Sequence, residues 1–542
     1  MSRLRGGQRD NVARFDAIAA QPEAAIVPRL ASFLVEGGEL ARAAAQAVAK
    51  CVAVATSDEL LELDEYCRQA WWGEYPYGND ARWQSLSPRD VAELVAPGSE
   101  AARVVGVVSF HPNGRVREAA VARLAKMSGG AELPFLLIRL NDWVDPIARR
   151  AEQALRQRLT ASYADAFVDN LAILLRLGAK RRRIHQALID GALSLLFEPG
   201  SRSALERGLT NSSRAVRRLL HLEMLTRPSP DSFEIVERAL SDDDTVIRMR
   251  ATRVARRELG ADSIHHLLPR MLRDPFPAVR AEAIAGAAEL GLPDVDERLF
   301  EALLDRSRMV RDTARFYLRR HRSFDAFSAF YRERLVSSTS SPTRQRILTS
   351  AIAGLGESGQ PQDVAVLIPF LGDVRPAVRV ASARAIAGLD MDTSLLRLLE
   401  MLGDPSPTVT RRVREILTLR AGSVSSDTLR RLMREIPFAH GRLDALRLGA
   451  QLGKWDALLL VLESVRDPDV EIRSTAQLAI RRWIEQQNTS FEQPVRRHLL
   501  GLRSSLAANR WSLDPATTNE LEAIVRYWNP SSPTERTTTN DS

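Results

Sequence analysis

Cysteine and lysine are nearly absent from this sequence. Its two cysteines, Cys51 and Cys67, are 16 positions apart, which does not match the short spacing of a zinc or redox pair. We therefore expect two reduced, buried thiols and no disulfide framework. Lysine occurs four times among 76 basic residues, so arginine supplies almost all of the positive charge.

Long apolar runs are also missing. No run approaches the roughly 20 apolar residues that a membrane-spanning helix needs, and no signal-like apolar stretch follows Met1–Asp10. These absences predict a cytoplasmic protein without membrane association. Hydrophobic residues make up 45% of the chain and charged residues 27%, which is enough apolar material for a folded core.

The net charge of +8 and the isoelectric point near 9.9 allow two interpretations. A basic surface attracts polyanions, so nucleic acid is a possible partner. A GC-rich genome that favours arginine codons would give the same composition without any anion-binding surface.

A short motif recurs along the chain and dominates its organisation. An acidic or amide residue is followed six positions later by an arginine that comes after a β-branched residue. The strict examples are Asp242/Arg248, Asp274/Arg280, Asp305/Arg311, Asp373/Arg379 and Asp467/Arg473. The looser examples are His111/Arg117, Asn211/Arg217, Asp142 with Arg149, and Asp404 with Arg411. The period is about 31 to 34 residues, so degenerate repeats are expected near Arg183, Arg346 and Arg442.

Each period has the pattern of two helices. In the clearest repeat, a first apolar stripe at helical spacing comes before the turn 274–277, where proline ends the helix. A second apolar stripe follows and stops at Gly291. The stripes consist of Ile264, Leu267, Leu268, Met271 and Leu272, and of Val279, Ala283, Ala287 and Leu290. Neither helix can bury its stripe alone, so neighbouring repeats must stack.

The motif Asp-Pro-x-Pro-x-Val-Arg at 274–280, with its echoes at 373–379, 404–411 and 467–473, resembles that of HEAT repeats. It is also similar to the repeats of phycobilisome-lyase-like proteins. The resemblance covers roughly residues 100 to 486, with a diverged repeat at 28–50. It implies an all-α fold, an α-α superhelix of about 12–14 helical hairpins, in which the turn aspartate and the arginine form a structural ladder between neighbouring repeats.

The remaining segments set the predicted domain boundaries. Residues 1–99 form an N-terminal helical cap, and 100–333 and 345–486 form two blocks of repeats. The Ser/Thr-rich segment 334–344 separates the blocks. A C-terminal helical cap covers 487–528, and the Pro/Ser/Thr-rich residues 529–542 are expected to be a disordered tail.

An aromatic insertion at 66–83 is a candidate partner contact. It is rich in glycine and proline, as loops are, and aromatic residues are favoured at interface hot spots. The alternative is that its rings cap the end of the core. The candidate residues are Trp71, Trp72, Tyr75, Tyr77 and Trp83.

Arginines at helical spacing are candidates for binding phosphates or an acidic peptide. In 308–322 four of these candidates, together with the ladder residue Arg311, lie on one predicted helix face, which the HEAT resemblance places on the concave side. The alternative is a solvated face with local acidic partners. The candidates are Arg181, Arg182, Arg183, Arg250, Arg253, Arg257, Arg308, Arg315, Arg319 and Arg322.

Recognisable catalytic and metal-binding patterns are missing. Gly354–Gly359 matches the dinucleotide fingerprint by letter, but it follows a helical run rather than a strand, so we expect an inter-repeat turn. The eight histidines have no metal-ligand spacing. We expect no enzyme activity, no cofactor, no metal and no small-molecule substrate.

Three functional hypotheses remain at this point. The leading one is a scaffold that binds a protein partner on its concave surface. The second is a nucleic-acid-binding solenoid, whose binding should weaken on charge reversal at Arg315 and Arg319. The third, which we disfavour, is a HEAT-type lyase or DNA glycosylase.

Overall fold

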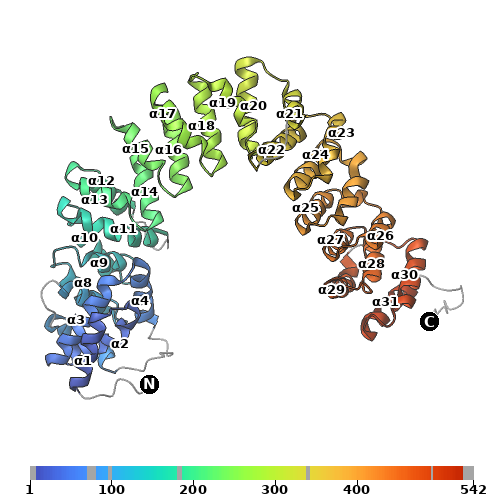
Figure 1. Cartoon of the computed structure of the whole chain (residues 1–542). Helices are drawn as coiled ribbons and strands as arrows, with labels where there is room; N and C mark the ends of the chain where they lie inside the picture. Colours follow the sequence, from blue (N-terminus) through green and yellow to red (C-terminus); the bar gives the residue numbers. More distant parts are fainter. Residues whose placement is uncertain are drawn as a thin grey trace, which may run out of the picture. The chain divides into compact units, whose positions relative to one another are not determined.

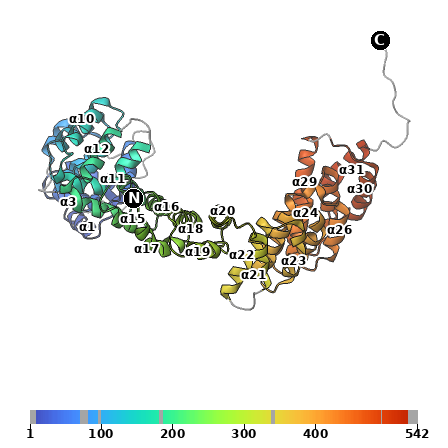
Figure 2. The ribbon, with the colours of Figure 1, turned by 90° about the horizontal axis from the view of Figure 1, so that it is seen from above.

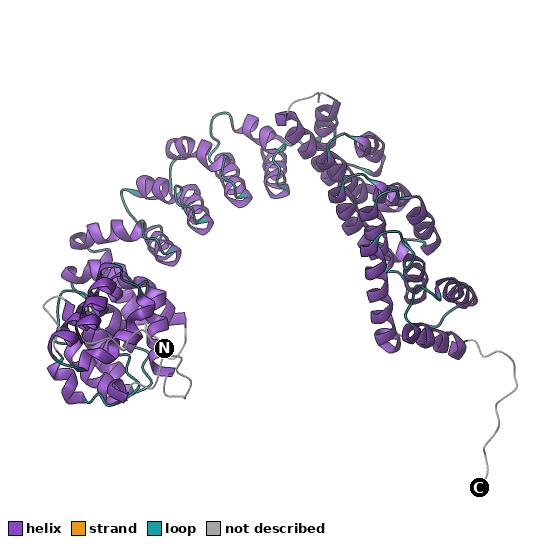
Figure 3. Cartoon of the chain, turned by 60° about the horizontal axis from the view of Figure 1, so that its bottom comes forward, coloured by secondary structure: helices purple, strands orange, loops and turns teal. Residues whose placement is uncertain are grey.

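A computed structural model describes residues 8–69, 81–94, 100–179, 186–336, 342–489 and 492–528. These residues form helices joined by turns, and no strand occurs among them (Figures 1 and 3). The predicted all-α superhelix is confirmed. The chain divides into two compact units, residues 1–258 and 259–542, and this division falls inside the predicted block 100–333.

The first unit starts with helices that lack the Asp/Arg motif and continues as helical hairpins. Its long helix α3 packs against α1 and α7 through buried alanines, whose small side chains allow close approach. Its α-helices are α1 (Gln8–Ala20), α2 (Val27–Ala31), α3 (Gly38–Val54), α4 (Ser57–Gln69), α5 (Ala81–Gln84), α6 (Pro88–Glu93), α7 (Ala101–Val108), α8 (Gly114–Leu124), α9 (Leu133–Arg139), α10 (Asp145–Arg156), α11 (Ala164–Ala179), α12 (Gln186–Leu196), α13 (Arg202–Leu209), α14 (Arg214–Met224), α15 (Ser232–Ala239) and α16 (Thr245–Glu258).

The second unit is a series of helical hairpins that follow one another in chain order (Figures 1 and 2). Its α-helices are α17 (Ala261–Leu272), α18 (Pro277–Glu289), α19 (Val295–Ala302), α20 (Arg308–Arg322), α21 (Phe327–Val336), α22 (Pro342–Ser358), α23 (Val364–Leu367), α24 (Pro376–Glu400), α25 (Pro407–Thr418), α26 (Ser426–Glu435), α27 (Ala439–Gly449), α28 (Lys454–Ser464), α29 (Val470–Gln486), α30 (Arg496–Asn509) and α31 (Pro515–Trp528).

The turn between α17 and α18 shows how the repeated motif makes a hairpin. Asp274 accepts a hydrogen bond from the backbone N–H of Phe276 through its Oδ1 atom, at 2.8 Å. Pro277 then occupies the first helical position of α18, where its missing N–H costs nothing. Gly291 ends the hairpin in the left-handed conformation, with φ at 58°.

The two predicted stripes of this repeat are mostly buried. Ile264, Leu267, Leu268 and Met271 of α17 lie in the core, as do Val279, Ala283 and Ala287 of α18. Leu290 departs from the prediction and is exposed. It is the C-cap residue of α18, where the backbone begins to leave the helix before Gly291.

Helix α24 combines two helices of neighbouring repeats without a loop between them. Asp390 has φ −158° and ψ 87°, which breaks the helix at that residue. Its carboxylate accepts hydrogen bonds from the backbone N–H and the hydroxyl of Thr393, at 3.2 and 2.6 Å, and so caps the second half. Two repeats therefore meet here without an intervening loop.

The prediction of a turn at Gly354–Gly359 was wrong for most of its length, because α22 continues to Ser358. A Cβ atom at Gly354 would lie 2.2 Å from Cζ of Tyr331, and one at Gly356 would lie 2.5 Å from Cβ of Ala385. Only glycine leaves room for α21 and α24 at these points.

Candidate binding surfaces

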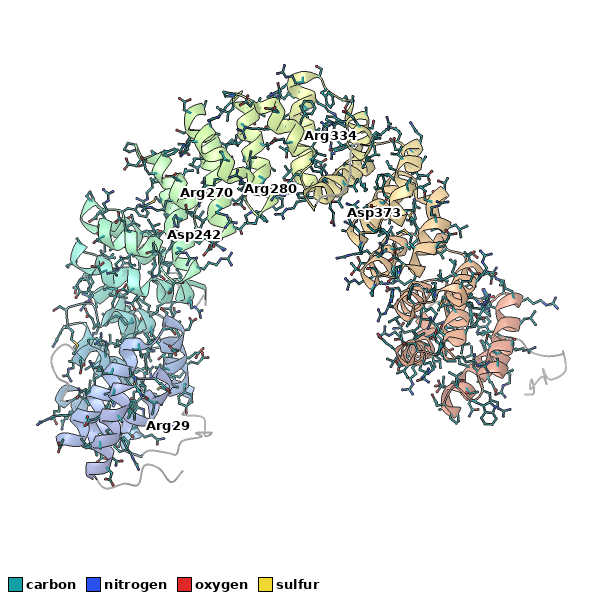
Figure 4. All side chains as sticks on the ribbon, viewed as in Figure 1. Arg29, Asp242, Arg270, Arg280, Arg334 and Asp373 are labelled. Atoms are coloured by element: carbon teal, nitrogen blue, oxygen red, sulfur yellow. The ribbon has the colours of Figure 1, made fainter. Side chains whose placement is uncertain are left out.

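Each regular rung of the predicted ladder is one arginine that joins two successive repeats. Arg280 of α18, labelled in Figure 4, donates from Nη1 to the backbone oxygen of Asp274, at 2.7 Å. Its Nε and Nη2 atoms donate to the two carboxylate oxygens of Asp305 in the next turn, both at 2.8 Å. This bidentate geometry fits a guanidinium and a carboxylate, so the rung fixes the spacing of adjacent hairpins.

The same bridge recurs wherever the next turn carries an aspartate 25 residues ahead. In each case the arginine also donates to a backbone oxygen six residues behind it. The further rungs are Arg117 to Asp142, Arg217 to Asp242, Arg379 to Asp404, and Arg442 to Asp467. Arg442 was expected as a degenerate position, and Arg248 and Arg473 make the same carbonyl contact with Asp242 and Asp467.

Arg311 bridges to a different acid. It donates to the backbone oxygen of Asp305 as the motif requires, but its carboxylate partner is Glu357 at the end of α22. Arg315, one turn further along α20, donates to the same Glu357 at 2.8 Å and to the Tyr331 hydroxyl oxygen at 3.2 Å. Burial raises the pKa of Tyr331 to about 12, so its hydroxyl stays protonated.

Two arginines assigned to the ladder by sequence do not belong to it. Arg411 is exposed, and Thr410 occupies the rung position instead. The Thr410 hydroxyl donates a hydrogen bond to the carboxylate of Asp444, at 2.8 Å, and Arg414 donates to the same carboxylate. Arg149 is exposed as well and pairs with Asp145 within α10. In both cases the one-residue shift turns the side chain by about 100° around the helix, away from the next turn.

A buried ionic cluster extends the first unit's ladder toward the N-terminal helices. Asp142 accepts hydrogen bonds from both Arg117 and Arg139, at 2.9 and 3.1 Å, and Arg139 also pairs with Asp64 of α4. Although burial opposes it, the hydrogen bonds and charges of the two arginines lower the pKa of Asp142. The sequence motif could not identify Asp64 or Arg139, because neither occupies the repeated spacing.

The predicted arginine face of α20 is largely neutralised. Arg308 pairs with Asp312, Arg319 with Asp325, and Arg322 with Asp296. Arg315 was wrongly placed on this surface: it is 4% exposed and belongs to the Glu357 cluster. The sequence could not show this, because Asp296 and Glu357 are distant along the chain.

The other arginine candidates differ in their exposure to solvent. Arg250 is half-buried on α16, whereas Arg253 and Arg257 are exposed. Arg181, Arg182 and Arg183 lie outside the described residues.

The aromatic insertion is described only in part. Trp71, Trp72, Tyr75 and Tyr77 lie outside the described residues, as does the predicted tail. Trp83 is 8% exposed, packs against the His111 ring at 5.0 Å, and accepts a hydrogen bond at its backbone oxygen from Nε2 of His111. It is therefore a core residue, and its assignment as a partner contact is corrected.

Exposed apolar side chains on the second helices were missed by the sequence analysis. Met309 and Phe316 of α20 are 52% and 53% exposed. Seven residues separate them, so they lie two turns apart on one face of the helix. In the sequence both lie among the arginines of 308–322, where two large apolar residues seven positions apart on a charged helix face were the available signal.

The described residues hold no group of three or more acidic, histidine or cysteine side chains placed to bind a metal ion. Within the same part of the chain, no helix combines the length and apolar character needed to cross a membrane.

The acidic turn 242–244 has a structural explanation. Although burial opposes it, hydrogen bonds from Arg214 and Arg218 hold the pKa of Asp244 far below its usual range.

Comparisons with known proteins give only distant likenesses. No family model matches the sequence, and no curated protein matches it. Among solved structures, importin beta crystallised in ammonium sulfate is similar at 13% identity and a TM-score of 0.40, over 95% of this chain and 79% of that one. Yeast importin-beta (Kap95p) is similar at 14% identity and a TM-score of 0.30, over 92% and 71%. These scores are too low to carry a functional argument. The helical hairpins and the arginine ladder are features of the chain itself, and its fold is that of a HEAT-repeat solenoid.

Proposed function

We propose that this protein is a non-enzymatic scaffold that binds a protein partner along its second helices, the side that is concave in HEAT-type solenoids. The observation that carries the proposal is the exposed apolar pair of α20, Met309 and Phe316. Large apolar side chains left in water on a well-packed helix mark interaction sites when they lie together on one face.

The charge pattern around this pair favours a protein over a nucleic acid. Three exposed arginines of α20 already have carboxylate partners, and Arg315 is buried. A phosphate backbone would have to displace these acids, whereas a protein partner can use the apolar pair and leave the ion pairs at the rim. Nucleic-acid binding is therefore the weaker alternative.

A capture experiment with the full chain tests the proposal. We expect the wild-type protein to retain a defined partner from native extract, and Phe316→Asp to lower that retention at least tenfold. Leu396→Asp is the matched control, because Leu396 is 49% exposed on the second half of α24. Equal loss in both variants, or no retained protein, contradicts the proposal.

A salt titration with duplex and single-stranded nucleic acid tests the alternative. The exposed residues Arg308 and Arg319 are suitable for charge reversal, whereas Arg315→Glu would unfold the cluster around Glu357 and report stability instead. Tight, salt-sensitive binding that the Arg308→Glu/Arg319→Glu variant loses would replace the scaffold proposal.

A further inference from the structure

We propose that the second unit holds an anion-binding pocket of its own, which recognises a phosphate group. The pocket is a hollow of about 420 Å³ lined by residues of the hairpins α17/α18 and α19/α20 and by Arg346 of α22. It is independent of the apolar pair of α20 and does not rest on the proposed scaffold function.

Arginines surround the hollow in excess of acids. Arg280 also lines the hollow, but its guanidinium already donates to both carboxylate oxygens of Asp305. The charges of this pair cancel, so it adds no net positive charge to the lining. Four further arginines remain, and Arg306 is held in place because its Nη2 atom donates to the backbone oxygen of Pro275 at 3.0 Å. These four are Arg273, Arg298, Arg306 and Arg346.

Arg298 is the residue that most directly indicates a ligand. Its Nε atom is buried and has no hydrogen-bond partner among the described residues. A guanidinium with an unpaired donor is under-satisfied in the protein, and the forked N–H groups of the Arg298 side chain, which lines the hollow, gain hydrogen bonds when an oxyanion enters it. Arg273 and Arg346, both exposed at the rim, have no carboxylate partner in the described part of the chain.

The acids of the lining are Asp274, Asp305 and Glu301. Asp305 is held by Arg280, and Asp274 accepts the backbone N–H of Phe276. Glu301 lies one turn beyond Arg298 on α19 and is the side chain that would compete with an incoming anion. A guanidinium binds phosphate in the same forked geometry as carboxylate, and a phosphate carries more charge, so it wins this competition.

A second hollow at the corresponding place between later hairpins provides an internal comparison. It is lined by Arg430, Arg434 and the rung Arg442 to Asp467. Here Arg430 and Arg434 both pair with Glu463. In the second hollow, the position equivalent to Arg298 is Leu460, and a carboxylate pairs with two of the lining arginines, whereas no carboxylate pairs with Arg298 among the described residues.

The test is calorimetric titration of the full chain with inorganic phosphate and with a phosphoserine peptide at low ionic strength. We expect both probes to bind, with about tenfold weaker binding in Arg298→Gln, where a charged hydrogen bond is lost. Arg346→Gln, an exposed change that leaves the fold intact, should weaken binding as well. Glu301→Gln should strengthen it by removing the competing carboxylate.

The control is Arg434→Gln in the second hollow, which should bind phosphate as the wild type does. Tighter binding of the peptide than of inorganic phosphate assigns the pocket to a phosphorylated chain, and equal binding assigns it to free phosphate. The proposal is overturned if neither probe binds at millimolar concentration, if Arg298→Gln and Arg346→Gln bind like the wild type, or if Arg434→Gln weakens binding equally.

Discussion

At the scale of single residues, the ladder arginines act as links between repeats. Each one donates hydrogen bonds to a backbone carbonyl of its own turn and to a carboxylate of the next turn, as Arg280 does to Asp274 and Asp305. Removing one partner of a buried pair costs more than the pair contributes, because a charge is left without compensation.

Asp305→Asn should therefore destabilise the second unit by about 3 kcal/mol, the lower end of the range for breaking a buried ion pair. The measurement is the midpoint of urea unfolding. Glu415→Gln is the comparison, since its pair with Arg412 is exposed on α25, and it should shift the midpoint far less. Equal shifts would show that the rung is not a structural link.

His111 makes the first unit sensitive to mild acid. Its Nδ1 atom accepts the backbone N–H of Asn113 at 3.0 Å and its Nε2–H donates to Trp83, which requires the neutral ring. Burial lowers the pKa of His111 below 6.5. Because the unfolded chain then binds the proton more readily, stability is full above pH about 6.5 and falls as pH drops below it.

We expect unfolding free energy to decline as pH falls from about 6.5 to about 5, before most carboxylates titrate, and His111→Asn to reduce this decline. Asparagine keeps an acceptor near the position of Nδ1 but does not titrate. An unchanged pH dependence in the variant would assign the decline to another group.

At the scale of elements, sequence periodicity predicted the helical hairpins well where the turn carried proline or glycine. The α17/α18 hairpin is the clearest case, because the apolar stripes and the 274–277 turn agree with each other. The junction at Asp390 and the long helix α22 were not predicted. In α22 the glycines do not form a turn. They allow the helix to pack closely against Tyr331 and Ala385, which are distant in the sequence.

Gly354→Ala tests this explanation of α22. The added methyl would overlap the Tyr331 ring, so we expect destabilisation of about 1 to 3 kcal/mol despite the better helix propensity of alanine. Gly372→Ala is the control, since nothing lies within 4 Å of its Cβ position. Thermal unfolding measures both, and a stabilised Gly354→Ala would show that the close packing is wrong.

At the scale of the whole molecule, the sequence predicted the repeat architecture but only part of the candidate sites. The motif revealed the arginines of the ladder because their spacing repeats. Their pairing with the aspartate of the next turn was expected from the HEAT resemblance. The burial of Arg315 and the exposure of Phe316 depend on how hairpins stack, which no local pattern encodes. The hollow at Arg298 was missed for the same reason, since it combines side chains of three hairpins.

The scaffold proposal makes position 316 the center of a protein contact. A photo-crosslinking amino acid placed there in the full chain should join covalently to one partner protein in native extract. The same amino acid at position 396, equally exposed before substitution, should give little product. A defined protein adduct at 316 alone is the predicted result, whereas equal labelling at both positions, or adducts with nucleic acid only, would contradict the proposed function.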